Sequence, residues 1–175
     1  MSAAIIDAGP SHTAQVQAIY AHWVLNGSGS FEEVPPDGAE MGRRRQLVQD
    51  LGLPYLVAEE NGVVQGFAYA GPYRPRPGYR YTVEDSVYVA PWTQAKGIGR
   101  RLLGEVIRRA EAAGKRQMLA IIGDSGNTAS IGLHEAMGFR RVGVFQSIGF
   151  KFGRWVDTVM MQRALGPGDG RLPPS

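Results

Sequence analysis

The hexamer Gln94-Ala95-Lys96-Gly97-Ile98-Gly99 places two glycines, one residue apart, where a strand-like segment gives way to an amphipathic helix. The first turn of a helix presents unpaired N–H groups and the positive end of the helix dipole. Glycine lets a bulky anion approach that backbone without meeting a Cβ, and Arg100 adds positive charge beside it. The hexamer and Arg100 therefore indicate an anion-binding loop. An ordinary helix start with a flexible glycine is the alternative interpretation.

Two nucleotide-binding motifs are excluded by the same residues. A dinucleotide fingerprint requires Gly-x-Gly-x-x-Gly, but Leu102 stands where the third glycine would follow Gly97 and Gly99. A P-loop requires two glycines separated by four residues and followed by Lys-Ser or Lys-Thr, and the sequence contains no such run.

Glu84 lies within the strand-like segment Tyr79–Ala90. Because side chains alternate along a strand, Glu84 shares a face with Arg80 and Asp85 points the other way. Burial would raise the pKa of a glutamate on such a face into a range useful for proton transfer. A solvated strand face or an ion pair with Arg80 is the alternative.

A polar stripe runs along the expected helix from Asn127 to Met137. Asn127 and His134 are seven residues apart, about two helical turns, and Ser130 lies between them on the same face. A lone histidine on a short helix is most often structural. The stripe nevertheless makes Asn127, Ser130 and His134 candidate site residues.

Three arginines precede Glu84 within seven residues. Arg74 and Arg76 belong to the stiff sequence Arg-Pro-Arg-Pro, and Arg80 follows. Guanidinium groups bind carboxylate and other anionic oxygens in a planar fork, so these three arginines are candidate substrate ligands; solvated loop arginines are the alternative. Phe31 and Glu32, in the loop after the first expected helix, are further pocket candidates.

The apolar periodicity and turn residues predict one domain over residues 1–165, with strands alternating with helices. Asn61-Gly62 marks a β-hairpin, and the tail 166–175 has a disordered composition. The predicted fold class is mixed α/β (α+β), with helices packed on one layer of sheet. Strands are expected at 3–6, 53–60, 63–71, 79–90, 117–123, 139–146 and 155–165, and helices at 16–24, 39–51, 98–113 and 127–137.

Composition narrows the functional classes. The chain has 175 residues, a formal net charge of +3 and no cysteine, which excludes disulfides, thiolate zinc sites and a cysteine nucleophile. No leader or membrane-spanning pattern is evident, so a cytoplasmic location is expected. The arginine pairs could contact nucleic acid, but no nucleic-acid motif accompanies them, and no nucleic-acid partner is predicted.

The motif Gln-x-x-Gly-x-Gly between a strand and a helix resembles the pyrophosphate loop of the GNAT superfamily of acetyl-CoA-dependent N-acetyltransferases. The resemblance covers about residues 3–163. The segments YLVAEENGVVQGFAYAGPYRPRPGYRYTVEDSVYV, LHEAMGF and GFKFGRWVDTVMMQR are similar to the phosphinothricin and methionine sulfone/sulfoximine N-acetyltransferases. The resemblance implies a GNAT-like, mostly antiparallel sheet with a strand split at the acetyl-CoA site. It also implies acetyl transfer to the α-amine of a small amino-acid analogue, without a metal.

The resemblance also implies roles for particular residues. Glu84 occupies the position of the general base. His134 is the second catalytic candidate, as an acid, a base or a hydrogen-bond donor. Arg80 favours the methionine sulfone/sulfoximine type. A homodimer is expected, with residues 150–155 near its interface and the substrate. Acetyl-CoA would contact Val87, Tyr88, Val89, Gln94, Ala95, Lys96, Gly97, Ile98, Gly99, Arg100, Asn127 and Ser130.

Two other functions are compatible with the same motifs. One keeps the fold and replaces the acceptor by a protein N-terminus or a polyamine, although three arginines disfavour a polyamine. The other is a non-catalytic module that binds coenzyme A or nucleic acid.

Overall fold

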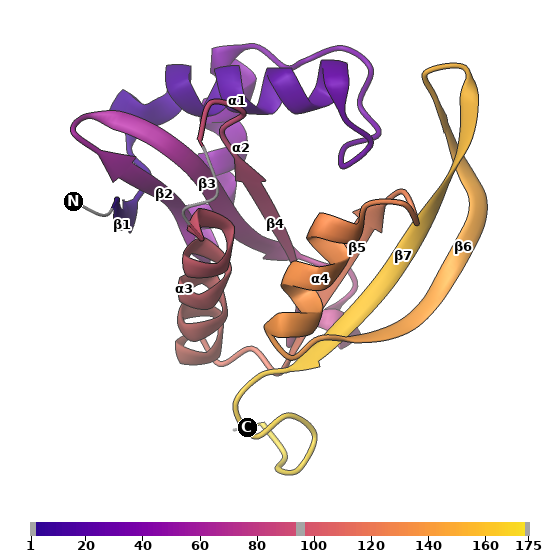
Figure 1. Cartoon of the computed structure of the whole chain (residues 1–175). Coiled ribbons are helices and arrows are strands. Elements are labelled where there is room, and N and C mark those ends of the chain that lie inside the picture. Colours follow the sequence, from indigo (N-terminus) through magenta and orange to yellow (C-terminus); the bar gives the residue numbers. More distant parts are fainter. Residues whose placement is uncertain (1–2, 94–96, 174–175) are drawn as a thin grey trace.

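The computed structural model describes residues 3–93 and 97–173. One seven-stranded sheet is flanked by helices on both faces (Figure 1). The elements, in chain order, are β1 (Ala4–Asp7), the 3₁₀ helix η1 (Pro10–His12), α1 (Thr13–Asn26), α2 (Gly38–Asp50), β2 (Tyr55–Glu60), β3 (Val63–Pro72), η2 (Pro77–Tyr79), β4 (Thr82–Val89), α3 (Ile98–Ala112), β5 (Gln117–Gly123), α4 (Thr128–Ala136), β6 (Arg140–Lys151) and β7 (Arg154–Ala164).

The strand order is β1-β2-β3-β4-β5-β7-β6, and every neighbouring pair is antiparallel except β4 with β5. Asn61 and Gly62 connect β2 to β3 with positive φ angles of 52° and 77°, as a tight hairpin turn requires. The predicted mixed α/β class with a mostly antiparallel sheet is therefore confirmed.

The helices divide the sheet into two faces. On one face, α3 lies beside α4. Gly99 of α3 is so close to Leu133 of α4 that a Cβ added to the glycine would lie 3.4 Å from the leucine side chain. On the other face, α1 packs its Tyr20 ring against Phe67 of β3 and Tyr88 of β4. The apolar stripe of α3 is fully buried, which gives this face a continuous core.

The sheet opens between β4 and β5. These strands pair only from Thr82 to Glu84, opposite Gln117 to Leu119. Beyond Glu84, β4 stays paired with β3 as far as Val89, while β5 stays paired with β7 as far as Gly123. The two strands therefore diverge after Glu84 and leave a gap in the sheet.

Strands β6 and β7 form a long hairpin that projects beyond the rest of the sheet (Figure 1). The hairpin continues past the predicted end of its first strand, residue 146, as far as Lys151. Many of its large apolar side chains are exposed, namely Val142, Val144, Phe145, Ile148, Phe150, Phe152 and Trp155.

The chain after β7 was expected to be disordered from residue 166. In the structure, residues 166–169 form turns, and the Gly168 N–H donates to the Leu165 carbonyl and the Gly170 N–H to the Pro167 carbonyl, both at 2.9 Å. Leu165 itself is fully buried and anchors the start of this segment.

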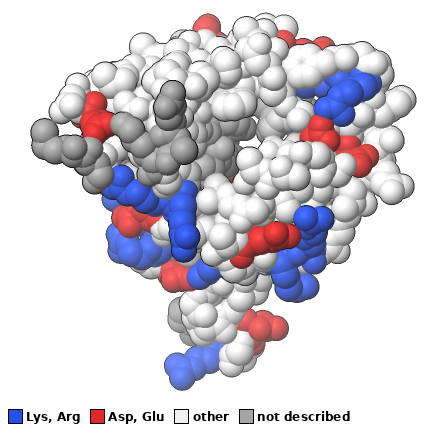
Figure 2. All heavy atoms as spheres, in the orientation of Figure 1, with Lys and Arg blue, Asp and Glu red and all other residues white. Residues whose placement is uncertain are grey.

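Surface charge is mixed in sign. Figure 2 shows basic and acidic side chains interspersed over one face, which is hollowed near its centre. Several of the clustered arginines are ion-paired: Arg108 and Arg109 contact Glu105, and Arg141 contacts Glu135. In the part of the chain that the structure describes, no helix is long and apolar enough to cross a membrane.

Candidate active site

A cleft of about 540 Å³ occupies the gap between β4 and β5. Its walls come from both strands, from α4, from Trp23 of α1 and from the loop after α1. Glu84 lies at the point where the strands part, and the Trp23 indole donates a hydrogen bond of 2.8 Å to the Val89 carbonyl at the far end of β4. The divergence of two strands has thus created an open site within the sheet.

Glu84 faces the aromatic side of the sheet. It lies opposite Gly71 of β3, on the face that carries Tyr69 and Tyr88. Burial, and secondarily the charge of Asp85, raise the pKa of Glu84 to about 7. A carboxylate of this kind can accept a proton near neutral pH.

Asp85 points to the opposite face and meets His134 of α4. The His134 Nε2 lies 2.9 Å from Asp85 Oδ2, and its Nδ1 lies 2.7 Å from the Ser130 carbonyl oxygen. The side chains of His134 and Asp85 are only 5% and 2% exposed. Because a carbonyl only accepts, Nδ1 carries a proton, and the imidazolium form donates from both nitrogens.

The electrostatics favour that charged form. Burial lowers the pKa of His134, but the Asp85 carboxylate and the Ser130 carbonyl outweigh burial and raise it above the ordinary value. Asp85 Oδ1 is buried and has no hydrogen-bond partner within the described residues. Adjacent residues of β4 thus present a candidate proton acceptor on one face of the sheet and a histidine–carboxylate pair on the other.

Asn127 and Ser130 also line the cleft. Asn127 is the N-cap of α4, where its side-chain oxygen accepts a 3.2 Å hydrogen bond from the Ser130 N–H. The predicted polar stripe of Asn127, Ser130 and His134 therefore does face the gap between the strands.

The start of α3 shows why two glycines are needed there. Gly97, the N-cap residue, has a φ of 64°, which favours glycine. A Cβ on Gly99 would contact Leu133 and Val89 at 3.4 Å, so this glycine permits close packing of α3 on α4 and β4. Arg100 is exposed. The predicted cofactor residues Gln94, Ala95 and Lys96 lie outside the described residues.

Of the predicted pantetheine contacts, Val87, Tyr88 and Val89 line the cleft. The start of α3 lies on the same side as α4, next to these residues. The start of α3 therefore adjoins the part of β4 that lines the cleft, at Val87 and Val89.

The predicted substrate arginines lie apart from this cleft. The Arg74 guanidinium stacks on the Tyr73 ring, and the Arg80 guanidinium stacks on the Tyr81 ring and donates to the Pro77 carbonyl at 3.1 Å. All three arginines, Arg76 included, are exposed, and none lines the cleft.

Phe31 and Glu32 belong to the loop between α1 and α2. Phe31 packs on Gly149 of β6, and Glu32 is ion-paired with Arg44 of α2 at 2.8 Å. Sequence reasoning did not assign site roles to Tyr69, Ser30 or Gly123, all of which line the cleft. Their contribution depends on long-range packing and leaves no local motif.

The acetyltransferase (GNAT) family model matches residues 17–139. The chain is 59% identical over 158 residues to the phosphinothricin N-acetyltransferase of Alcaligenes faecalis, covering 90% of this chain and 80% of that protein. It is 44% identical over 152 residues to the L-methionine sulfoximine/L-methionine sulfone acetyltransferase of Salmonella typhimurium, covering 87% and 88% respectively.

Among solved structures, the crystal structure of a GNAT superfamily phosphinothricin acetyltransferase from Sinorhizobium meliloti in complex with AcCoA matches with a TM-score of 0.96. The sequence identity is 44%, and the match covers 100% of this chain and 95% of that one.

Proposed function

The chain belongs to the acetyltransferase (GNAT) family, and from that premise we propose that it transfers acetyl from acetyl-CoA to the α-amine of a small amino-acid analogue. The acceptors proposed are phosphinothricin, methionine sulfoximine and methionine sulfone. The observation that carries this proposal is the gap between β4 and β5, with the half-buried Glu84 carboxyl at its base. Acetyl-CoA supplies an activated thioester, which an amine can attack once it has lost a proton.

We assign the donor to the surface from α3 to β4. The amides at Gly97, Ile98, Gly99 and Arg100 are the proposed ligands of the diphosphate, because the first N–H groups of a helix have no partner within the helix and lie at its positive end, here the start of a fifteen-residue helix. The edge of β4 that has left β5, at Val87 to Val89, is the proposed contact for the pantetheine arm.

Glu84 is the proposed general base. Its carboxylate takes a proton from the ammonium group of the acceptor, and the neutral nitrogen attacks the thioester carbonyl carbon. The C–N bond forms, the nitrogen of the tetrahedral adduct releases its second proton to solvent, the C–S bond breaks and coenzyme A leaves as a thiolate. The pKa near 7 suits this role, because an appreciable fraction of Glu84 is ionised at neutral pH.

His134 is the proposed proton donor to the leaving thiolate. A role as the base is disfavoured, because the raised pKa keeps the imidazole protonated. Both ring nitrogens have partners, Nδ1 the Ser130 carbonyl and Nε2 the Asp85 carboxylate, so donation to the thiolate requires one of these hydrogen bonds to open. Asp85 holds the imidazolium charged on the face of β4 opposite Glu84. Glu84 thus takes up a proton on the acceptor side, and His134 supplies a different proton on the donor side.

The substrate proposal predicts acetyl-CoA-dependent thiol release with each of these acceptors. We expect kcat/KM for methionine sulfoximine, methionine sulfone and phosphinothricin to exceed that for spermidine at least tenfold, measured with a thiol reagent. The ratio of kcat/KM for methionine sulfoximine to kcat/KM for phosphinothricin decides which of the two is the preferred acceptor. Absence of thiol release above the acceptor-free rate with all three compounds would contradict the proposal.

We also propose that the protein is a homodimer, and a cytoplasmic location stays a prediction. The support for a dimer is the β6–β7 hairpin, a sheet edge with exposed apolar side chains.

The dimer prediction can be tested by light scattering after size-exclusion chromatography. Trp155, 65% exposed on the hairpin, is the test position, and Trp92, 53% exposed outside it, is the matched control. The wild type should elute at twice the mass of one chain, Trp155→Ser should shift towards one chain, and Trp92→Ser should not. A monomeric wild type would refute the dimer.

A further inference from the structure

Lys151 is a buried cation outside the proposed chemistry. It ends β6 and is only 3% exposed. Its Nζ donates to two backbone carbonyl oxygens of the loop after α1, at 2.9 Å to Gly27 and 2.7 Å to Ser30. Removal from water lowers the pKa of this ammonium group, an effect that Glu33 and Glu32 oppose. Burying the charged end of a lysine costs free energy of desolvation. A lysine buried against two backbone carbonyls therefore requires an explanation.

The loop that Lys151 contacts forms one wall of the cleft. Gly29 and Ser30 line it directly. At the end of β5, the Ser28 carbonyl lies so close to Gly123 that a Cβ there would overlap it. A Cβ on Gly149 of β6 would likewise overlap the Phe31 ring. The loop is therefore packed against β5, which flanks the gap, and against β6 at the edge of the sheet.

This wall lies on the side of Glu84. The Ser30 hydroxyl is 2.9 Å from the Tyr20 hydroxyl, and the Tyr20 ring contacts Tyr88 on the aromatic face of the sheet. Glu84 belongs to that same face, whereas α3 and α4 cover the other one. The loop thus borders the acceptor side of the cleft, and the proposed donor surface lies across the sheet.

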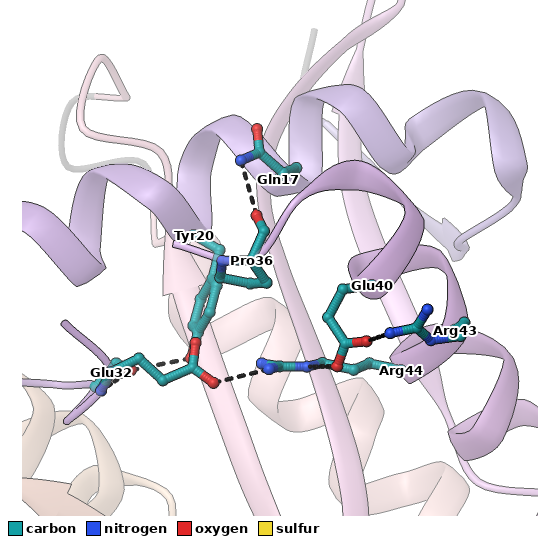
Figure 3. Close-up of polar contacts among 8 residues, drawn as sticks. Gln17, Tyr20, Glu32, Pro36, Glu40, Arg43 and Arg44 are labelled. Atoms are coloured by element: carbon teal, nitrogen blue, oxygen red, sulfur yellow. Dashed lines mark hydrogen bonds and ion pairs between the residues drawn. The ribbon is translucent and has the colours of Figure 1, made fainter. Parts of the chain in front are cut away.

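The loop is held from two directions. Arg44 lies between Glu32 and Glu40 (Figure 3) and is 2.8 Å from each carboxylate. The Gln17 side chain donates a 3.0 Å hydrogen bond to the Pro36 carbonyl. These contacts tie the second half of the loop to α1 and α2. On the opposite side, Lys151 supplies hydrogen bonds from the hairpin to the first half.

We propose that Lys151 is a positioning residue that fixes residues 27–33 as the acceptor-side wall of the cleft and so sets the affinity for the amino-acid acceptor. This inference rests on the proposed function for the identity of the acceptor. It predicts a selective effect: loss of Lys151 loosens the wall that borders the acceptor, while the surface from α3 to β4 keeps its geometry.

The test is Lys151→Met, which keeps the length of the side chain and removes its donors. We expect the KM for methionine sulfoximine to rise about tenfold or more, with the KM for acetyl-CoA within about twofold of wild type. Lys151→Gln, which retains an amide donor, should recover part of the loss. Arg141→Met is the matched control, since it removes an exposed charge from the same strand.

A second readout does not depend on turnover. Amide hydrogen exchange in residues 27–33 should become faster in Lys151→Met, with α3 and α4 unchanged. Unchanged exchange in this loop, an unchanged acceptor KM, or equal rises in both KM values would each overturn the inference. A wild-type enzyme that acetylates none of the acceptors would instead refute the proposed function, and the exchange measurement would still decide whether Lys151 holds the loop.

Discussion

Replacing Glu84 by glutamine should lower kcat/KM by about a hundredfold to ten-thousandfold, the usual contribution of a general base. Glutamine keeps the size of the side chain but cannot accept a proton from the amine. The wild-type rate should also fall about tenfold per pH unit below a pH of about 7, where Glu84 becomes protonated. The variant should lose this dependence, which a pH series of thiol-release rates will show.

Stability separates this effect from unfolding. The folded-state pKa of Glu84 is about 7, above its ordinary value of 4.5, so ionisation between these values costs stability as the pH rises. The Glu84→Gln protein should therefore unfold at a temperature no lower than the wild type at pH 8. Glu111→Gln, outside the cleft lining, is the control. A Glu84→Gln rate at pH 8 within a few-fold of wild type would exclude Glu84 as the base.

Replacing Asp85 by asparagine should move the whole pH profile to lower pH and lower its maximum about tenfold to a hundredfold. The Asp85 carboxylate raises the pKa of His134, so without it the histidine loses its proton at lower pH. The same carboxylate contributes to the raised pKa of Glu84, so the acidic limb should move in the same direction.

Nuclear magnetic resonance can follow this change at the histidine itself. The chain has three histidines, and the ring signals of His134 should titrate at lower pH in Asp85→Asn than in the wild type. Asp7→Asn, which loses a surface ion pair with Arg109, should leave the profile unchanged. If Asp85→Asn lowers the rate but moves neither the acidic nor the basic limb of the pH profile, the Asp85–His134 pair has a structural role and His134 is not the proton donor.

Local patterns were sufficient to predict most helices and strands and the mixed α/β class, whereas the split, mostly antiparallel sheet was predicted from the family resemblance. The Asn61-Gly62 turn, the apolar stripe of α3 and the continuously apolar β5 each encode one element within a short window. The face of Glu84 also followed from simple alternation, since β4 pairs with β3 without a bulge. These predictions depend on neighbours in sequence, which is why they could be made without a structure.

The rest of the site depends on contacts between distant segments. Asp85 and His134 are 49 residues apart, and their hydrogen bond arises only when α4 packs beside β4. The positions of Arg74 and Arg80 depend on how their loop places neighbouring tyrosines, which the sequence does not specify. Lys151 lies in the run 150–155, which the resemblance placed near a dimer interface and the substrate without a role for the lysine, and its partners lie more than 120 residues earlier.

The short pairing of β4 with β5 has a cost as well as a use. Backbone hydrogen bonds join the two halves of the sheet over only three residue pairs, from Thr82 to Glu84. A longer pairing would add cohesion but would fill the space that the reacting groups need. The cleft is therefore a trade-off between rigidity and activity. Substitutions that lengthen the pairing of β4 with β5 should raise the unfolding temperature of the protein and lower its turnover rate.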